Sequence, residues 1–480
     1  MSSLAKQSLN GVFWSAVEKF SLQGVQFIIG VILARLLTPS DFGMIGMLTI
    51  FLAVSQIFID CGFTNALIRQ KVVTERDYGT AFLLNALISM AAFAVLWMAA
   101  PLVASFYNLP DLKSVMRVVA FTLIINSLFA VHKAKLTRNV DFKTQSKCSL
   151  TAAILSGCIG IGLAYSGFGV WSLVYQNIAN CLLNFLLMVV LLKWFPRPCF
   201  DKSSFHCMFG FGSKLLVASL IGAVYENLYT IVIGKKFTAT NLGYFSRANQ
   251  LGDFPSSNIA GILSRVTFPI LSKLQGDSVK LNSVYEKYLK ISCFAVFPLM
   301  LGLCALAKPT IVLLIGEKWL PAVLLLQILI IGKMWDPVCN INLNLLYVKG
   351  RSGLVLKLEI LKKTIAVTIL FASIPFGLVG MCIGRACYGF LAMFLNTLYT
   401  RQFIQLSSWK QIWLVLPYFL LSIVMGGIVY FVTLVIESLA LQLILGILVG
   451  VFFYIGIAYA LKMDACVDLI RIIKGRKSNA

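Results

Sequence analysis

The chain has 480 residues, of which 59% are hydrophobic and only 12% are charged. A soluble globule of this composition would expose more apolar surface than water tolerates, so the composition excludes an ordinary soluble protein and indicates a membrane protein. The 41 Lys and Arg residues outnumber the 18 Asp and Glu residues, which fits a nucleic acid, an anionic lipid or an anionic substrate. The basic residues stand in short loops between apolar runs, and this position argues against nucleic acid.

Runs of about 20 apolar residues are long enough to cross roughly 30 Å of hydrocarbon. About fourteen such runs follow one another along the chain. The sequence therefore predicts an all-α polytopic membrane protein with about 14 transmembrane helices. In chain order, the runs lie near residues 11–36, 42–66, 80–106, 112–131, 148–167, 169–192, 209–234, 242–272, 285–307, 319–347, 354–375, 378–402, 411–434 and 438–461.

The first run shows no small-residue cleavage pattern, so we expect an uncleaved first span. The twelve cysteines are scattered through the apolar runs without a Cys-x-x-Cys pair or a His-rich partner. We interpret them as small apolar packing residues and expect neither a metal site nor a redox site.

Loop charge predicts the orientation, because the basic residues of short loops are retained on the cytoplasmic side. With the N-terminus inside, the even-numbered loops and the C-terminal tail hold most of the Lys and Arg residues, and the odd-numbered loops hold few. One missed or additional span would disrupt this alternation. We therefore expect both termini to be cytoplasmic.

No predicted loop exceeds about 20 residues, which leaves no room for an extramembrane catalytic domain. A membrane-embedded polymerase or glycosyltransferase generally needs a sizeable loop or domain that carries acidic or His residues. We therefore expect a transporter and no enzyme.

An internal repeat relates two loops that lie 200 positions apart. Residues 35–43 read RLLTPSDFG and residues 235–243 read KKFTATNLG, and each segment joins one span to the next. Because the first and the seventh span both start inside, the two repeats are parallel and related by an axis along the membrane normal. We predict an N-terminal six-helix lobe over 1–202, a C-terminal six-helix lobe over 203–404, and helices 13 and 14 with a basic tail over 405–480.

Polar residues recur at steps of three or four along the first two spans of each repeat, which places them on one face of each helix. A charged group in a span costs about 2.5–3.5 kcal/mol on insertion scales, so such faces indicate a wet cavity or a buried partner. We expect the two lobes to face each other across a cavity. The faces comprise Ser15, Lys19, Gln23, Gln26 and Gly30; Thr49, Gln56, Asp60 and Thr64; Ser219, Gly222, Glu226 and Thr230; and Arg247, Gln250, Asn258, Gly261 and Arg265.

Several of these charges also have a structural interpretation. Lys19 and Asp60 lie near the predicted cytoplasmic ends, where snorkelling to the interface fits as well as a cavity role. For Arg247, at the opposite end, snorkelling fits at least as well as ligand contact. Lys333 and Asp336 share a face of the tenth span and fit a structural pair.

Glu226 and Arg265 lie deep in their runs, which favours a functional role for both. A cavity that carries Lys214, Arg247 and Arg265 suits an anion, and phosphate is the anion that Arg matches best. Glu226 and Asp60 are candidates for binding a coupling ion, and an antiporter can hold both kinds of site. The candidate substrate-binding residues are Lys19, Gln26, Lys214, Arg247, Asn258 and Arg265.

Several segments of the first 280 residues together carry a family resemblance. They are residues 34–43 (ARLLTPSDFG), 60–71 (DCGFTNALIRQK), 167–174 (GFGVWSLV) and 243–250 (GYFSRANQ), followed by Pro255, Phe268-Pro269 and residues 271–275 (LSKLQ). At these residues the chain resembles the polysaccharide-exporting flippases, the Wzx-like branch of the multidrug, oligosaccharidyl-lipid and polysaccharide exporter superfamily, and most of all the colanic-acid exporter type. The last two hundred residues match mainly in topology.

The resemblance implies two six-helix lobes around a cationic cavity in a bacterial inner membrane. Such a protein flips undecaprenyl-pyrophosphate-linked repeat units to the periplasmic face by alternating access, for O-antigen, capsule or exopolysaccharide synthesis. The implied partners are the lipid-linked glycan, membrane lipid, and a polysaccharide polymerase with chain-length machinery. We expect no cofactor, and coupling to a H⁺ or Na⁺ gradient is suggested for this family.

Two alternatives stay open. An ion-coupled drug or cation antiporter of the same superfamily would have the same lobes but should prefer an acidic, aromatic pocket. A lipid II flippase would share the chemistry of the substrate.

Overall fold

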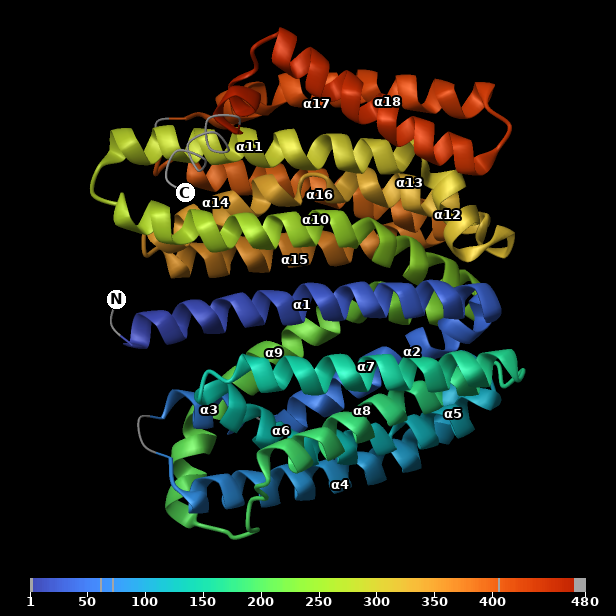
Figure 1. Ribbon diagram of the computed structural model, residues 1–480, viewed down its shortest axis with the longest axis vertical. Helices are drawn as coiled ribbons and strands as arrows, with labels where there is room; N and C mark the ends of the chain where they lie inside the picture. Colours follow the sequence, from blue (N-terminus) through green and yellow to red (C-terminus); the bar gives the residue numbers. More distant parts are fainter. Residues whose placement is uncertain (1–2, 61–62, 71–72, 405, 470–480) are drawn as a thin grey trace. The chain divides into compact units, whose positions relative to one another are not determined.

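A computed structural model describes residues 3–60, 63–70, 73–404 and 406–469 (Figure 1). Every regular element in these ranges is a helix, and none is a strand. Lipid favours this outcome, because a helix satisfies its backbone hydrogen bonds within one segment. The predicted fold class, an all-α polytopic membrane protein, is confirmed.

Contacts along the chain divide it into two compact units, Met1–Gly243 and Tyr244–Ala480. The helices of the first unit are α1 (Ser3–Leu36), α2 (Pro39–Asp60), α3 (Phe63–Arg69), α4 (Glu75–Tyr107), α5 (Asp111–Val119), α6 (Phe121–Arg138), α7 (Phe142–Tyr165), α8 (Val170–Leu192) and α9 (Lys202–Lys236).

Helix α10 (Ala239–Lys273) begins in the first unit and continues through the second. It is followed by α11 (Ser278–Ala305), α12 (Ala307–Ile315), the short η1 (Glu317–Trp319), α13 (Pro321–Lys333), α14 (Asp336–Val348), α15 (Ser352–Ser373), η2 (Ile374–Phe376), α16 (Gly377–Thr400), α17 (Ser408–Val435) and α18 (Leu439–Ala460).

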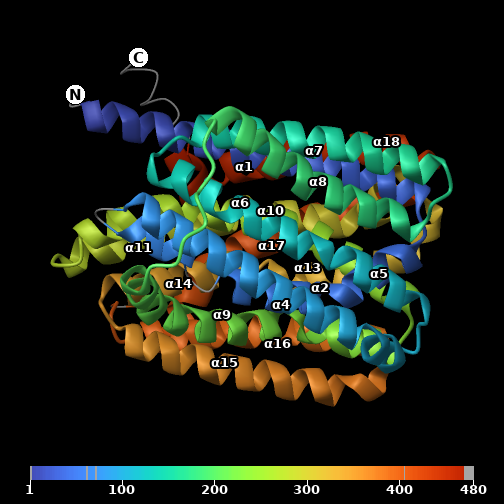
Figure 2. The same cartoon turned by 90° about the horizontal axis from the view of Figure 1, so that it is seen from below.

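The number of membrane-spanning helices agrees with the sequence. Eleven segments of the described residues are long and apolar enough to cross a membrane, and one of them, Ser352–Thr400, contains both α15 and α16. These two helices pack side by side as a hairpin (Figure 2). Helices α9 and α10 have 35 residues each, which also suffices to span. Counting α15 and α16 separately and adding α9 and α10 gives fourteen spans.

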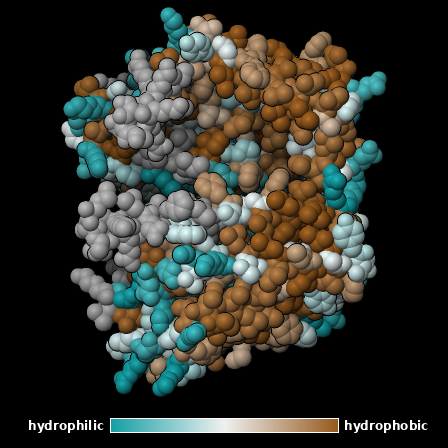
Figure 3. Space-filling view, in the orientation of Figure 1, coloured by the Kyte–Doolittle hydropathy of each residue, from teal (hydrophilic) through white to brown (hydrophobic). Residues whose placement is uncertain are grey.

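Apolar side chains cover the middle of the helices, and hydrophilic side chains gather near the helix ends (Figure 3). Inside the first unit, a core cluster joins Phe63 of α3, Tyr78 and Phe82 of α4, Val131 of α6 and Met208 of α9. Helix α9 therefore packs with the first unit, although the sequence repeat assigns it to the C-terminal lobe. The lobe boundaries at 202/203 and 404/405 stay a prediction from the repeat.

Loops predicted to share one side of the membrane meet in the first unit. Lys135, at the end of α6, lies 3.7 Å from the Glu75 carboxylate at the start of α4. Its ammonium also lies 3.5 Å from the centroid of the Trp194 ring, in the loop after α8. The Trp194 indole nitrogen donates to Glu75 over 3.1 Å. At the other side, Lys235 donates to the carbonyl of Phe106. These contacts agree with the predicted alternation of loops, and the side of the membrane on which each loop lies stays a prediction.

The two copies of the repeated loop pack directly against each other within the first unit. A Cβ atom on Gly43 would lie 1.7 Å from the carbonyl oxygen of Ala239, and one on Gly243 would lie 1.9 Å from that of Pro39. Gly43 and Gly243 occupy equivalent positions of the repeat, and so do Pro39 and Ala239. The glycine of each copy therefore contacts the equivalent residue of the other copy. Only glycine permits so close an approach of two backbones.

Candidate functional site: a polar cluster and an apolar groove in the second unit

The residues predicted to bind substrate lie on α1, α9 and α10. Lys19, Gln26 and Arg265 are exposed. The guanidinium of Arg247 donates to Gln250 over 2.6 Å, and the side-chain amide of Asn258 donates to the carbonyl of Phe254 over 2.8 Å. The side chain of Lys214 lies outside the described residues. Since these helices belong to two units, the grouping of these residues into one cavity stays a prediction.

The two predicted ion-coupling residues lie on α2 and α9. Glu226 of α9 is exposed and forms no ion pair with any side chain that the structure describes. Gln26, its counterpart 200 positions earlier, is exposed as well. The side chain of Asp60 is outside the described part of the chain.

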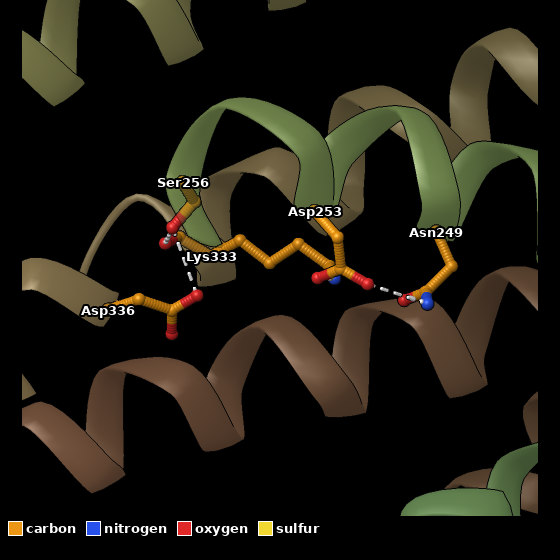
Figure 4. Close-up of polar contacts among 5 residues, drawn as sticks. All are labelled: Asn249, Asp253, Ser256, Lys333 and Asp336. Atoms are coloured by element: carbon orange, nitrogen blue, oxygen red, sulfur yellow. Dashed lines mark hydrogen bonds and ion pairs between the residues drawn. The ribbon is translucent and has the colours of Figure 1, made fainter. Parts of the chain in front are cut away.

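The second unit contains a polar cluster that joins α10 to α13 and α14 (Figure 4). The Lys333 ammonium at the end of α13 forms an ion pair with Asp253 of α10. The amide of Asn249 donates to the same carboxylate over 2.9 Å. The Ser256 hydroxyl lies 3.0 Å from the carbonyl oxygen of Lys333 and 3.1 Å from the carboxylate of Asp336, at the start of α14.

A break in the tenth span positions the charges of this cluster. Helix α13 ends at Lys333 and α14 begins at Asp336. A cation is stabilised at a helix C-terminus and an anion at an N-terminus, so both charges suit the partial charges of the helix ends. Trp335, in the break, is buried and packs against the rings of Phe297 and Phe390. The break is therefore enclosed by protein, as irregular backbone at membrane depth requires.

The sequence marks Lys333 and Asp336 as charged residues of the tenth span but does not identify their partners on α10. By sequence the two residues fit a structural pair, whereas in the structure the ion pair of Lys333 is with Asp253, and Asp336 accepts a hydrogen bond from Ser256. Asn249, Asp253 and Ser256 follow one another at steps of four and three, which places them on one face of α10. That spacing marks a polar face on α10, but it does not show which helix the face contacts.

An apolar groove of about 520 Å³ lies in the same unit, between α11, α12, α17 and α18, with Pro255 of α10 at its edge. Among its lining residues, only Thr310 and Tyr454 carry a polar side-chain atom, and the Tyr454 hydroxyl donates to the carbonyl of Phe294. Leu299 and Ile455 of the lining are exposed at the surface. The groove can therefore hold a hydrocarbon chain from the surrounding lipid.

A sequence model of the polysaccharide biosynthesis protein family matches residues 32–324, which is more than half of the chain. The chain belongs to this family. The teichuronic acid biosynthesis protein TuaB of Bacillus subtilis (strain 168) is 27% identical over 356 residues, 74% of each chain. The lipopolysaccharide biosynthesis protein WzxC of Escherichia coli (strain K12) is 24% identical over 446 residues, 88% of each chain.

Solved structures of transporters share the fold of this family member. The lipid II flippase MurJ, in an inward closed conformation, superposes with a TM-score of 0.75 at 16% identity, covering 94% of this chain and 99% of that chain. An inward-facing multidrug resistance transporter of the MATE family reaches a TM-score of 0.61 at 15% identity, covering 79% and 93%. At these identities the similarity shows the fold, a MurJ-like and MATE-like bundle of transmembrane helices.

Proposed function

We propose that this protein translocates an undecaprenyl-pyrophosphate-linked oligosaccharide across a bacterial inner membrane by alternating access. The product serves the synthesis of a surface polysaccharide such as O-antigen, capsule or exopolysaccharide. The match to the polysaccharide biosynthesis protein family over residues 32–324 carries the proposal. The names of TuaB and WzxC, both biosynthesis proteins of bacterial surface polymers, support it.

The apolar groove supports a lipid-linked substrate over a free sugar. While the sugar and its pyrophosphate cross, the prenyl chain must stay in apolar surroundings, because each exposed CH₂ group costs about 0.8 kcal/mol in water. The groove offers apolar walls from Phe294, Pro298, Met425 and Val429. In this proposal it holds the chain next to the membrane.

The predicted cationic residues serve the pyrophosphate in this proposal. The phosphate and sugar groups would contact Arg247, Arg265 and Lys214 on α9 and α10, and Lys19 and Gln26 on α1. Arginine matches phosphate through paired N–H donors. In this proposal both termini lie in the cytoplasm, as the basic residues of the even-numbered loops predict. A polysaccharide polymerase and chain-length machinery are proposed partners at the periplasmic face.

We infer a transporter without catalytic activity of its own. A multidrug or cation antiporter and a lipid II flippase share the fold, but the names of the sequence relatives favour export of a surface glycan. Succinoglycan biosynthesis transport protein ExoT of Rhizobium meliloti (strain 1021), 23% identical over 68% of this chain, adds a relative named as a transport protein.

A complementation experiment tests the proposed function. The gene is expressed in bacterial strains that each lack their own flippase for one surface polysaccharide, and the surface glycan is measured with specific antibodies or lectins. Restored glycan in at least one strain is the expected result. No restoration in any strain, with the protein inserted in the membrane, would contradict the proposal.

A further inference from the structure

We propose that Arg117 and Lys113 of α5, together with the Trp97 ring of α4, form a binding site for the phosphate of an anionic membrane phospholipid. The site lies in the first unit, where α4 ends and α5 begins. Loop charge predicts that this end of the two helices is periplasmic. The site is independent of the proposed transport function and of the cluster and groove in the second unit.

A proline in α4 fixes the position of Arg117. Pro101 lies inside α4 and has no backbone N–H, so the carbonyl of Trp97, four residues earlier, lacks its donor within the helix. The Arg117 Nε donates to this carbonyl over 3.4 Å. The guanidinium carbon also lies 4.7 Å from the centroid of the Trp97 ring, which is a cation–π contact. These two contacts together hold the guanidinium against α4.

The other donors of Arg117 have no carboxylate partner. A guanidinium carries five N–H donors in a planar fork, and the Trp97 carbonyl takes only the one on Nε. Neither Arg117 nor Lys113 forms an ion pair with any side chain that the structure describes. Lys113 is exposed and lies four residues before Arg117, which places both cations on one face of α5. This face therefore has donors available for an anion.

The helices around α5 do not supply the missing negative charge. Those that pack most extensively against it are α4, α6 and α8. Helices α6 and α8 contain no Asp or Glu, and the two acidic residues of α4, Glu75 and Asp77, lie in its first turn at the opposite end. Asp111 begins α5, and the helix still carries one net positive charge. The local charge therefore favours an anionic ligand.

The surroundings of the site indicate a lipid ligand. Helix α4 has 33 residues and is about 50 Å long, so its ends extend beyond the roughly 30 Å of hydrocarbon. Trp97 lies about 15 Å before the end of α4 at Tyr107, near the boundary between hydrocarbon and headgroups, where Trp is common. Met98, Leu102 and Phe121, which flank it, are large apolar side chains exposed at the surface. This surface therefore faces lipid, and the phosphates at its level belong to phospholipid headgroups.

Charge selects an anionic phospholipid over a zwitterionic one. In a zwitterionic headgroup an ammonium group accompanies the phosphate, and two cations without acidic partners repel it. Phosphatidylglycerol carries the phosphate charge alone. Arg117 matches two phosphate oxygens through paired N–H donors, and Lys113 adds a point charge. A phosphate partner also explains why two basic residues stand in an odd-numbered loop, where the positive-inside rule leaves few.

Native mass spectrometry of the purified full chain, titrated in detergent with phosphatidylglycerol, tests the site. The dissociation constant of the first bound lipid is measured for each protein. Arg117→Gln should weaken phosphatidylglycerol binding about fivefold, the contribution expected of one cation near anionic lipid. Lys113→Gln should weaken it in the same direction. Binding of zwitterionic phosphatidylcholine should stay the same in both variants.

Lys308→Gln is the matched control. Lys308 of α12 is exposed, stands in another odd-numbered loop and contacts no aromatic ring in the described part of the chain. This variant should bind phosphatidylglycerol as the wild type does. An equal loss in Lys308→Gln would overturn the proposal, because it would show a general attraction between basic residues and anionic lipid.

Lys113→Gln decides the proposal if Arg117→Gln does not fold, since the Trp97 carbonyl then loses its donor. The Lys113 side chain has no partner among the described residues, so its replacement should leave the fold intact. Wild-type affinity for phosphatidylglycerol in Lys113→Gln and in a folded Arg117→Gln would overturn the proposal. So would an equal loss of phosphatidylcholine binding in Lys113→Gln.

A second lipid distinguishes a membrane phospholipid from a transported one. Undecaprenyl pyrophosphate is added at equal concentration to the wild type with bound phosphatidylglycerol. Phosphatidylglycerol should stay bound, because in this proposal the site on α4 and α5 belongs to the membrane phospholipid. Displacement of phosphatidylglycerol that is lost in Arg117→Gln would overturn the assignment to a membrane phospholipid.

Discussion

Two buried lysines of the second unit reach their carboxylates in different ways. Lys362 pairs with Glu359 three residues earlier on α15, so this pair stabilises a single helix. Lys333 pairs with Asp253 on another helix, so its pair joins α13 to α10. Leaving a buried charge without its partner is strongly unfavourable. The pair of Lys333 and Asp253 therefore stabilises a contact between two helices, whereas the pair of Lys362 and Glu359 acts within one helix.

The paired glycines of the repeated loop give a prediction at the same scale. Gly43→Ala and Gly243→Ala should each lower the thermal unfolding temperature in detergent, because the added Cβ would overlap a carbonyl oxygen of the other loop. Overpacking of this kind costs about 1–3 kcal/mol.

Gly24→Ala on α1 is the control, since no atom lies within 4 Å of its added Cβ. It should leave the unfolding temperature unchanged or raise it slightly. Equal unfolding temperatures for Gly43→Ala and Gly24→Ala would show that the two loops do not pack as described.

Helix starts depend on short capping motifs at the loops. Asp201 begins α9 and accepts from the backbone amide of Ser204 over 2.8 Å, and Asp277 begins α11 in the same way with Lys280. The backbone and hydroxyl hydrogen bonds of Ser204 hold the pKa of Asp201 below its ordinary value. A carboxylate with a lowered pKa stabilises the fold above its unfolded pKa, and this stabilisation is lost as the pH falls through the folded value.

Replacement of this cap should therefore have a pH-dependent effect. Asp201→Ala should lower the unfolding temperature at neutral pH, because an amide of the first turn loses its acceptor. The difference from wild type should shrink as the pH falls through the lowered pKa. Asp201→Asn keeps an acceptor and should retain most of the stability without the pH dependence. A constant difference for Asp201→Ala at all pH values would refute the role of the ionised cap.

Hydropathy identifies the spans but not the breaks within them. The predicted run 42–66 contains the end of α2 at Asp60 and the start of α3 at Phe63, and the run 319–347 contains the break between Lys333 and Asp336. An apolar average over twenty residues does not register two residues that leave the helix. The partner of Lys333 was missed for a related reason, because Asp253 lies 80 positions away and only tertiary packing brings it near.

At the scale of the whole molecule, the sequence alone predicts the all-α class, about fourteen spans and the repeat, because the lipid solvent permits few alternatives. Charge alternation also predicts which loops share a side, and the contact of Lys135 with Glu75 and Trp194 agrees. The cavity residues are harder to predict, since a polar face on a helix does not reveal which helix it faces.

The orientation is open to a direct measurement. Reporter fusions at Lys143 and at Lys477 should both give a cytoplasmic signal, because both positions lie in basic segments on the same predicted side. A periplasmic signal at either position would contradict the fourteen-span topology with both ends inside.

The cationic residues should act through their charge. Arg265→Ala and Lys214→Ala should each reduce translocation of a pyrophosphate-linked substrate in proteoliposomes while the protein remains folded and inserted. A bidentate contact between Arg and phosphate that is lost should cost about 1.5–3 kcal/mol, or roughly a tenfold to hundredfold loss in affinity. Arg265→Lys keeps the charge and should retain part of the activity. Wild-type rates for both alanine variants would argue against an anionic ligand at these positions.

Translocation of lipid-linked oligosaccharide by the purified protein is the central claim, and one measurement tests it most directly. Proteoliposomes are loaded with undecaprenyl-pyrophosphate-linked oligosaccharide on both leaflets, and the fraction that an added, impermeant sugar-cleaving enzyme can reach is followed over time. With the protein present, cleavage should proceed beyond the outer-leaflet fraction toward completion. Protein-free liposomes should stop at that fraction. A plateau at the same fraction with the protein present, and for oligosaccharides from several bacterial surface polymers, would contradict the account.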